Sequence, residues 1–316
     1  MSVVVFGSLN MDLVTRVKRL PKPGETLMGS AFFTTAGGKG ANQAVAAAKL
    51  GAVVKMIGRV GDDVWGTELI AGLTAAGVET DGITTEPGVH SGVAVITVAE
   101  SGENQILGVY GANDRLDESD VERLKTRLIG AKVLLLQLEV PVQAVKQAAQ
   151  VAHEMRVTVV LDPAPVREES IAACYPFVDF LIPNETEASQ LVGFEVRDVE
   201  TATQASLVLH RQGVRNVIIK LGAKGAYYSK LRSPIDATDS QLETLWVPAF
   251  NVKAIDAVAA GDAFAGGFAV ALAEGQTEVE AVRWGCGAGA LATTKVGAQV
   301  AMSDRVTFDQ FLAGVT

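Results

Sequence analysis

The sequence contains few of the residues that build disulfide frameworks or metal–thiolate sites. Its 316 residues include two cysteines, Cys174 and Cys286, which are too few and too far apart for a disulfide scaffold or a cysteine zinc site. The three histidines are also dispersed and show no metal-ligand or catalytic-triad spacing. We therefore expect a protein of a reducing compartment, and we treat the histidines and cysteines as packing or surface residues.

Positive charge and long apolar runs are scarce as well. The chain has 27 Lys and Arg against 36 Asp and Glu, a net charge of −9. A chain with a net negative charge does not attract a polyanion through its overall electrostatic field, so nucleic acid is not an expected partner. A phosphate ligand therefore needs a locally built site. The sequence has no basic segment followed by an apolar run, and no uncharged apolar stretch of about 18 residues. We expect a cytoplasmic protein without a membrane span.

Short β-branched runs alternate with longer helical patterns along the chain. A strand over residues 3–7 precedes a helix of small residues over 41–49, and the alternation becomes regular from Lys132. In this later part we expect strands over 133–138, 157–161, 180–183 and 217–221, and helices over 142–155, 202–212, 264–273 and 279–294. Continuous apolar strands joined by such helices predict a doubly wound α/β fold, with a mostly parallel sheet and helices on both faces.

Two stretches depart from this alternation. Residues 12–36 carry two prolines and several glycines among short apolar runs, and residues 92–108 read as two strands around a polar turn. We interpret them as a small β-sheet lid inserted in a single domain that spans residues 1–316. Exposed strand edges of such a lid favour a homodimer formed through it.

The run of small residues from 256 to 262, DAVAAGD, stands just before a predicted helix. The backbone N–H groups of Ala260 and Gly261 are open to a phosphate there, and the helix dipole adds positive potential. Asp262 falls in the first turn, where the same field favours an ionised carboxylate. A carboxylate beside a phosphate pocket suits the proton of an attacking hydroxyl. Capping of the helix is the alternative role for Asp262, and this segment alone does not separate the two.

A glycine-rich turn, GGKGANQ at 37–43, opens the first helix. It is not a Walker A loop, because no glycine stands four residues before Gly38 and no Ser or Thr follows Lys39. Open backbone with Lys39 and Asn42 close by suits a polyhydroxylated ligand or charge support for a phosphoryl group. A tight turn with a solvated lysine is the alternative.

Polar residues also follow several predicted strands. In an open α/β sheet, ligands bind at the carboxyl ends of the strands, which makes Asn10, Asp12 and Glu139 candidates for sugar hydroxyls. Asn184 and Glu187 are three positions apart at a helix start and suit a hydrated Mg²⁺, which takes few protein ligands. Ordinary helix capping explains the same two residues equally well.

The strand predicted over 217–221 leads into a second glycine turn, KLGAKG at 220–225. Such a turn suits nucleotide phosphates or a ribose. A plain hairpin link to the apolar run that follows is an equally fair interpretation.

Taken together, these segments resemble the ribokinase-like carbohydrate kinases of the phosphofructokinase-B type over nearly the full length. The resemblance is carried, in order, by GSLNMD at 7–12, GGKGANQA at 37–44, QLE at 137–139, DPAP at 162–165, PNETE at 183–187, AGD at 260–262 and GAQ at 297–299. Each motif is weak alone, whereas seven in the family's order are specific.

The resemblance implies an ATP-dependent sugar kinase with Mg²⁺, in which the lid also forms the dimer contact. Asp262 matches the catalytic base. The positions that match sugar-binding residues are Asn10, Asp12, Gly38, Lys39, Asn42, Glu139 and Asp262. Those that match the nucleotide site are Asn184, Lys220, Gly222 and Gly225, beside the anion hole at Ala260 and Gly261, with Glu187 in the water network of Mg²⁺. An activating K⁺ is implied at Asp256, Val258, Thr293, Val296 and Ala298, mostly through backbone carbonyls.

The sequence departs from the family's pattern at three positions. Ala257 replaces the usual threonine before the anion hole, which removes a hydroxyl. Lys220 stands where a threonine is frequent, so hydroxyl contacts are lost although a lysine reaches phosphate. Met302 falls where an oxygen-bearing ligand of K⁺ is expected.

The leading hypothesis is therefore a kinase that converts ribose and ATP to ribose 5-phosphate and ADP. Asn10 beside Asp12 favours a hydroxyl-rich sugar over deoxyribose, because a buried amide that loses its partner hydroxyl is penalised. A kinase for deoxyribose, fructose or a nucleoside is the alternative within the same class. A catalytically silent sugar- or nucleotide-binding protein is the alternative from another class, and Asp262 argues against it because a binder needs no base.

Overall fold

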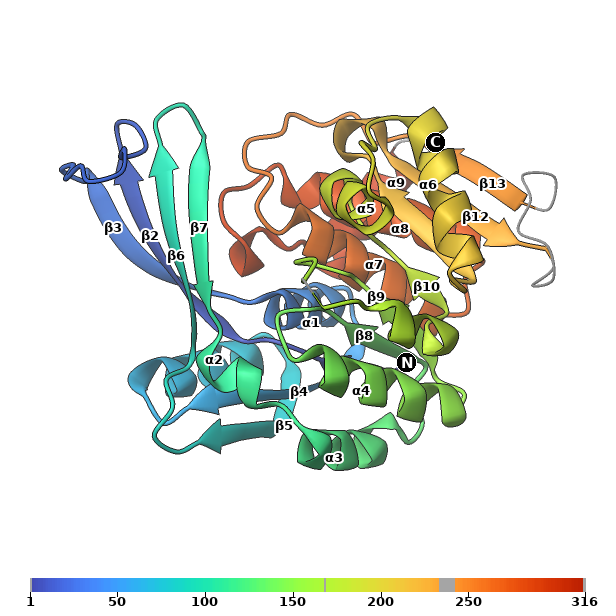
Figure 1. The fold of residues 1–316 in the computed structure, drawn as a ribbon, viewed down its shortest axis with the longest axis horizontal. Coiled ribbons are helices and arrows are strands. Elements are labelled where there is room, and N and C mark those ends of the chain that lie inside the picture. The colour runs from blue at the N-terminus through green and yellow to red at the C-terminus, as the bar shows by residue number, and fades with distance from the viewer. Residues whose placement is uncertain (1, 168, 233–241, 315–316) are drawn as a thin grey trace.

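In the part of the chain that the structure describes, nine strands form one large, mostly parallel sheet at the centre of the molecule (Figure 1). The computed structural model describes residues 2–167, 169–232 and 242–314. The strands are β1 (Ser2–Phe6), β4 (Val53–Gly61), β5 (Val78–Glu86), β8 (Val133–Leu136), β9 (Thr158–Leu161), β10 (Phe180–Leu181), β11 (Asn216–Lys220), β12 (Ala226–Leu231) and β13 (Leu242–Val247). Their order is β13-β12-β11-β10-β9-β8-β1-β4-β5, and only the β11–β12 and β12–β13 pairs are antiparallel.

Helices cover both faces of this sheet. They are α1 (Lys39–Lys49), α2 (Val64–Ala75), α3 (Glu118–Leu128), α4 (Val142–Glu154), α5 (Glu185–Val192), α6 (Val199–Arg211), α7 (Ala260–Ala273), α8 (Glu278–Ala292) and α9 (Arg305–Ala313). Alternate residues of β1 enter two separate cores: Val3 and Val5 pack with α1 and α7, whereas Val4 and Phe6 pack with α4. A strand buried on both faces explains the unbroken apolar run, and the predicted doubly wound α/β class is confirmed.

The strands and helices predicted after Lys132 all appear, with ends that differ by a few residues. The largest difference is at α7, which begins at Ala260 rather than at residue 264. Among the described residues, none of the helices is both long enough and apolar enough to span a lipid bilayer.

A second sheet of four strands projects from one side of the main body (Figure 1). Its strands are β2 (Asn10–Val17), β3 (Ala31–Gly37), β6 (Gly92–Ala99) and β7 (Asn104–Val109), in the order β3-β2-β6-β7. Asn10 pairs with both Gly37 and Gly92, so three strands meet where this small sheet joins the main body. These strands come from the two segments that the sequence analysis assigned to a lid.

Candidate active site

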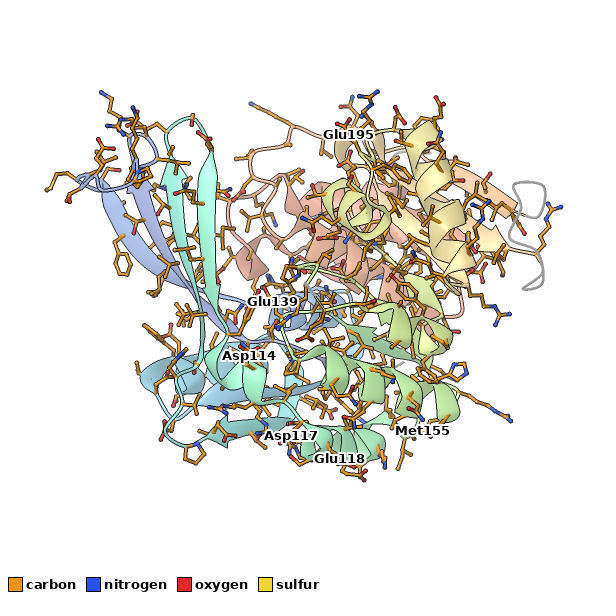
Figure 2. The ribbon with its side chains drawn as sticks, in the orientation of Figure 1. Asp114, Asp117, Glu118, Glu139, Met155 and Glu195 are labelled. Atoms are coloured by element: carbon orange, nitrogen blue, oxygen red, sulfur yellow. The ribbon has the colours of Figure 1, made fainter. Side chains whose placement is uncertain are left out.

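The candidate residues gather at one edge of the large sheet, beside the base of the small sheet. In a parallel sheet the carboxyl ends of the strands share an edge, and this edge carries residues from five of them: Asn10 after β1, Glu139 after β8, Asp162 after β9, Asn184 after β10 and Lys220 at the end of β11. Figure 2 shows Glu139 between the small sheet and the main body. The start of α7 brings Asp262 to the same edge.

Asp262 is held by side chains of α1 rather than by its own helix. Among the described residues its side chain makes no hydrogen bond to the start of α7, whose N-cap residue is Ala259, in the left-handed region with φ of 57°. Instead Asn42 Nδ2 donates to Oδ2 across 2.9 Å, and Gln43 Nε2 donates to Oδ1 across 3.2 Å. The capping interpretation of Asp262 is therefore wrong.

The pKa of Asp262 is raised to about 6, and burial is the main cause. The ammonium of Lys39 opposes the shift, and the neighbouring carboxylate of Asp162 adds to it. The sequence led us to expect that the helix field would favour the ionised form. The side chain is only 6% exposed, so desolvation shifts the pKa upward without removing the ionised form at neutral pH. A carboxyl group with this pKa is mostly ionised at neutral pH and accepts a proton readily.

The first turn of α7 leaves two backbone N–H groups open. Within the described residues, Gly261 N and Asp262 N have no backbone acceptor, whereas Ala260 N donates to the carbonyl of Ala257 across 3.2 Å. Of the two N–H groups expected to be open, at Ala260 and Gly261, the structure leaves that of Gly261 open, and that of Asp262 is open as well. Open N–H groups at a helix start are suited to phosphate oxygens.

A set of polar groups around Glu139, which we call the polar wall, lies at the same edge of the sheet and is held by hydrogen bonds. Oε2 of Glu139 accepts three hydrogen bonds, from Ser8 Oγ at 2.6 Å, Asn10 Nδ2 at 3.2 Å and Lys39 N at 2.9 Å. Asn113 Nδ2 donates to Asn10 Oδ1 across 2.8 Å, which fixes the amide of Asn10. In the described part of the chain, Oε1 of Glu139 accepts no hydrogen bond. That oxygen is open to a hydroxyl donor.

Asp12 and the glycine turn complete this polar wall. A Cβ at Gly37 would lie 2.3 Å from Asp12 Oδ2, and one at Gly38 would lie 2.6 Å from Asn10 N, so both glycines are needed for close approach. Gly38 also has φ of 88°, which other residues rarely adopt. Burial, with a smaller contribution from the carboxylates of Glu139 and Asp262, raises the pKa of Asp12 to about 7.

Lys39 is the first residue of α1 and is half-buried among carboxylates. Burial alone lowers the pKa of its ammonium, but four carboxylates outweigh that effect and raise the pKa overall. They are Asp262, Glu139, Asp162 and Glu187. No ion pair within 4 Å involves Lys39 among the described residues, so a protonated ammonium faces the cluster. This position fits the charge support for a phosphoryl group that the sequence suggested for Lys39.

Asn184 and Glu187 cap the start of α5 and remain within the cluster. Asn184 Oδ1 accepts from Glu187 N across 2.8 Å, and the Glu187 carboxylate accepts from Asn184 N at 2.8 Å and from Nδ2 at 2.9 Å. The capping alternative is thus present in the structure. Burial raises the pKa of Glu187, while Lys220 opposes the shift. Within the described residues, no group of three or more His, Cys, Asp or Glu forms a metal site by itself.

Lys220 reaches from β11 to the start of α7. Its Nζ lies 2.8 Å from Asp162 Oδ1, and a Cβ at Gly261 would meet that Nζ at 3.5 Å. The turn that follows does link an antiparallel hairpin, as one interpretation of the sequence held. A Cβ at Gly225 would lie 2.0 Å from the carbonyl of Val247, so packing alone requires this glycine. A Cβ at Gly222 would make only an ordinary contact with Glu185 Oε2 at 3.8 Å, but the φ of 53° at this position favours glycine.

The positions expected around K⁺ lie on two adjoining loops. Asp256 joins these loops, since its carboxylate accepts from Val258 N at 3.0 Å and from Gly297 N at 2.9 Å. The carbonyl of Thr293 already accepts from two backbone N–H groups, and that of Ala298 accepts from one. The carbonyls of Val258 and Val296 accept none within the described residues, and both side chains are exposed.

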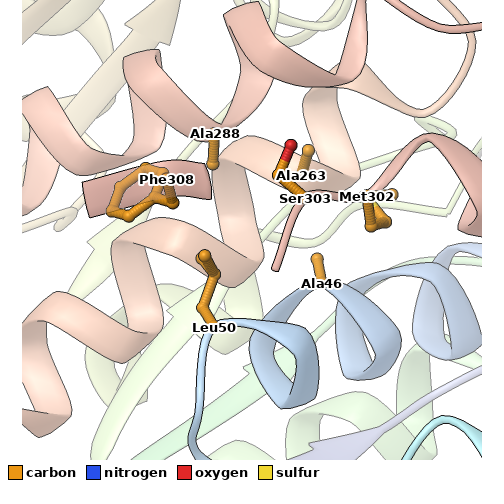
Figure 3. Close-up of a pocket in the computed structure, with 7 residues that line it drawn as sticks. All are labelled: Ala46, Leu50, Ala263, Ala288, Met302, Ser303 and Phe308. Atoms are coloured by element: carbon orange, nitrogen blue, oxygen red, sulfur yellow. The ribbon is translucent and has the colours of Figure 1, made fainter. Parts of the chain in front are cut away.

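Behind the start of α7 lies a small cavity of about 10 Å³ (Figure 3). Its lining residues are Ala46, Leu50, Ala263, Ala288, Met302, Ser303 and Phe308. The volume suits one water molecule at most, so the cavity is not a ligand site. Met302 lies here, buried, and its carbonyl accepts from Lys49 Nζ across 3.1 Å. Its thioether supplies no oxygen to the neighbouring loops.

Sequence reasoning missed four buried polar residues of the site. They are Ser8, Gln43, Asn113 and Asp162. Three of them lie inside the quoted motifs, which was the available signal, but a motif does not reveal which side chain its members contact. Asn113 follows β7 and lies outside every motif identified in the sequence.

A family profile described as pfkB family carbohydrate kinase matches residues 1–305. The sequence is 42% identical to the ribokinase of Haemophilus influenzae over 312 residues, 98% of each chain. It is 38% identical to the deoxyribokinase of Salmonella typhimurium over 269 residues, 85% of each chain. Among solved structures, Arabidopsis thaliana ribokinase complexed with ribose and ATP superposes with a TM-score of 0.86, at 32% identity over 98% of each chain.

Proposed function

The chain belongs to the pfkB family of carbohydrate kinases, and on this premise we propose that it transfers the γ-phosphoryl group of ATP to D-ribose, giving ribose 5-phosphate and ADP. The observation that carries the proposal is the position of Asp262. It is a buried carboxylate held by two amides between a polar wall and the open N–H groups of a helix start.

Asp262 acts as the base in the reaction. A sugar hydroxyl oxygen attacks the γ-phosphorus, the bond from that phosphorus to the β–γ bridging oxygen breaks, and ADP leaves with the electron pair. The hydroxyl proton passes to Asp262. In a loose phosphoryl-transfer transition state the base mainly orients the nucleophile, and the two amides that hold Asp262 provide that orientation.

Negative charge on the transferring group is met by fixed positive groups. The N–H groups of Gly261 and Asp262 point out of the first turn of α7, and the ammonium groups of Lys39 and Lys220 lie close to it. Donors that are already in place act where charge develops in the transition state, and burial strengthens them.

Glu187 fits a water-mediated Mg²⁺ site. It is a buried carboxylate whose oxygens accept, among the described residues, from Asn184 alone. Mg²⁺ usually keeps several waters and takes one or two carboxylates. When bound with ATP, Mg²⁺ supplies charge neutralisation at the phosphates. Asn184, Gly222 and Gly225 belong to the proposed nucleotide site on the same side.

A monovalent cation site at the loops joined by Asp256 is part of the proposal. The carboxylate of Asp256 and the open carbonyls of Val258 and Val296 suit K⁺, with Thr293 and Ala298 as further carbonyl donors. Because these loops flank the start of α7, a cation there would hold the anion hole in place. Replacing K⁺ by Na⁺ in the assay tests this assignment.

The sugar assignment rests on the polar wall and on the relatives. Asn10 and the open oxygen of Glu139 suit a hydroxyl-rich sugar, and the relatives include a ribokinase solved with ribose and ATP. Deoxyribose is the second candidate, since one relative at 38% identity is a deoxyribokinase. The two sugars differ by one hydroxyl, whose loss leaves a buried polar group without a partner.

The small sheet serves as the lid of the site and as the dimer contact in this proposal. Its strands begin beside the sugar-binding residues, and it exposes large apolar side chains, namely Phe32, Phe33, Val95, Ile106, Leu107 and Val109. Exposed apolar groups in one small sheet favour a partner surface.

The single domain with an inserted lid works in the cytoplasm, where free cysteines such as Cys174 and Cys286 stay reduced.

A coupled assay of ADP release tests the proposal. Mg²⁺-ATP is offered with ribose, deoxyribose, fructose and nucleosides, in K⁺ or in Na⁺. Turnover with ribose at the highest kcat/KM supports the assignment, and a higher value for deoxyribose replaces it with the second candidate. ATP binding without turnover on any sugar would instead indicate a catalytically silent binding protein.

A further inference from the structure

Asp162 is a buried carboxylate at the centre of the site to which the reaction described above gives no role. It directly follows β9, at the same sheet edge as Glu139 and Lys220, and only 1% of it is exposed. A buried carboxylate is retained in a fold only when other groups compensate its charge. Its partners therefore indicate what it does.

Each oxygen of Asp162 is bound to a different functional region. Oδ1 accepts from Lys220 Nζ across 2.8 Å, next to the start of α7. Oδ2 accepts from Gln43 Nε2 across 3.0 Å, and the same nitrogen donates to Asp262 Oδ1 across 3.2 Å. One amide group thus bridges two carboxylates.

The orientation of the bridging amide is fixed from its other end. Gln137 Nε2 donates to Gln43 Oε1 across 2.7 Å, so the oxygen of Gln43 faces Gln137 and its NH₂ group faces the two carboxylates. An amide NH₂ group has two hydrogens, one for each carboxylate. Gln43 and Gln137 are both fully buried, so bulk solvent does not compete for these bonds.

We propose that Asp162 is a positioning residue that joins Lys220, beside the phosphoryl site, to the base Asp262 through Gln43. This inference rests on the proposed kinase function and names a residue that the reaction scheme leaves unused. Asp162 keeps the Lys220 ammonium beside Gly261, and it keeps the Gln43 amide turned toward the base.

Asp162 also acts on the base through its charge. The charged groups that face Asp262 are Lys39 from α1, Asp12 from β2 and Asp162 from the end of β9, with Lys220 beyond Asp162. Asp162 raises the pKa of Asp262, whereas the hydrogen bond from Gln43 lowers it. Removing the charge of Asp162 should therefore lower the pKa of Asp262, whereas removing the hydrogen-bond donor of Gln43 should raise it.

The test is the pH dependence of kcat for sugar phosphorylation by the wild type, Asp162→Asn and Gln43→Leu. Catalysis needs ionised Asp262, so we expect the acid limb of Asp162→Asn to move by about 0.5 to 1 pH unit toward lower pH. We expect that of Gln43→Leu to move by a similar amount toward higher pH. The titration of ATP is common to all variants and cancels in the comparison.

Asp179→Asn is the matched control. Asp179 accepts a backbone hydrogen bond from Val159 at the amino end of the neighbouring strands, away from the site. Its replacement should leave the acid limb unchanged. A double-mutant cycle of Asp162→Asn with Lys220→Met should also be non-additive in kcat/KM for ATP, because the two side chains form one ion pair.

The possible outcomes separate this inference from the proposed function. Opposite shifts in the two variants support the role of Asp162. Lower activity with an unmoved acid limb in both variants overturns it and leaves the kinase function intact, since a merely structural residue lowers kcat equally at every pH. If Asp162→Asn does not fold, the acid limb of Gln43→Leu is the test: a shift toward higher pH supports the proposal, and an unmoved limb overturns it. A wild type without turnover on any sugar overturns both proposals.

Discussion

Asn42 donates a 2.9 Å hydrogen bond to Asp262 although 220 positions separate the two residues in the sequence. The contact exists because α1 and α7 pack closely, and glycine makes that approach possible. A Cβ at Gly266 would lie 2.5 Å from the Cβ of Ala46. The position of the base therefore depends on the packing of two helices whose amino ends both face the site.

Replacing Glu139 by glutamine should weaken sugar binding more than catalysis. Glutamine keeps one oxygen for the three donors that now bind Oε2, but its NH₂ group replaces the open acceptor Oε1. A hydrogen bond to a charged group contributes about 1.5–3 kcal/mol, so KM for the sugar should rise about 10- to 150-fold. Steady-state kinetics at saturating ATP measure this change. An unchanged KM would remove Glu139 from the sugar site.

Activity should fall on acidification with an apparent pKa near that of Asp262, which burial raises to about 6. The ionised carboxylate is the active form, so kcat should drop about tenfold for each pH unit below that value. A profile of kcat from pH 4.5 to 8.5 measures the limb. Full activity down to pH 4.5 would mean that the base is not a buried carboxyl group.

Two glycine replacements on α7 should separate activity from stability: one should lower kcat, and the other should lower the free energy of unfolding. In Gly261→Ala the added Cβ meets only Lys220 Nζ, at 3.5 Å, so the fold is unaffected while the methyl group covers the open N–H groups. We expect an unchanged melting temperature and a loss of kcat of about tenfold or more. Thermal unfolding and ADP release measure both quantities.

Gly266→Ala is the comparison for that variant. Its Cβ clashes with Ala46, so overpacking should lower the free energy of unfolding by about 1–3 kcal/mol. Equal loss of stability in both variants would contradict the assignment of Gly261 to the phosphate site.

Asp12→Asn should stabilise the protein at alkaline pH while it weakens sugar binding. Burial raises the pKa of Asp12 from 3.8 to about 7, so the folded state holds this proton more tightly than the unfolded chain. The ionised carboxylate destabilises the fold fully above pH 7, and this penalty disappears as the pH falls toward 3.8. The melting temperature of the variant should exceed that of the wild type at pH 8 and match it at pH 4. A constant difference across that range would show that the charge is not the cause.

The fold was predictable because its signals are local. The apolar run of β1 and the helical spacing after Lys132 indicate elements whose own residues determine them, and the order of the elements predicts the sheet. The edge that carries Asn10, Glu139 and Lys220 follows from the same topology. The start of α7 was misplaced because Ala259, a residue that seldom adopts positive φ, ends the preceding loop.

The electrostatics of the site were not predictable in the same way. The direction of the pKa shift of Asp262 depends on burial, and burial is a property of the folded chain rather than of the segment around Asp262. The role of Gln43 depends on Gln137 and Asp162, and no pattern within one segment identifies such partners. Asn184 illustrates a second limit of sequence-based prediction. Helix capping and ligand binding favour the same residue types, so the sequence does not separate these two roles.

The most direct test of the account is ribose-dependent ADP release by the wild type and by Asp262→Asn, with Asp309→Asn on the exposed face of α9 as the control. We expect turnover by the wild type and the control, a loss of about 10²- to 10⁴-fold in Asp262→Asn, and unchanged ATP affinity in all three. Comparable turnover by Asp262→Asn and the wild type would contradict the central claim that Asp262 is the base.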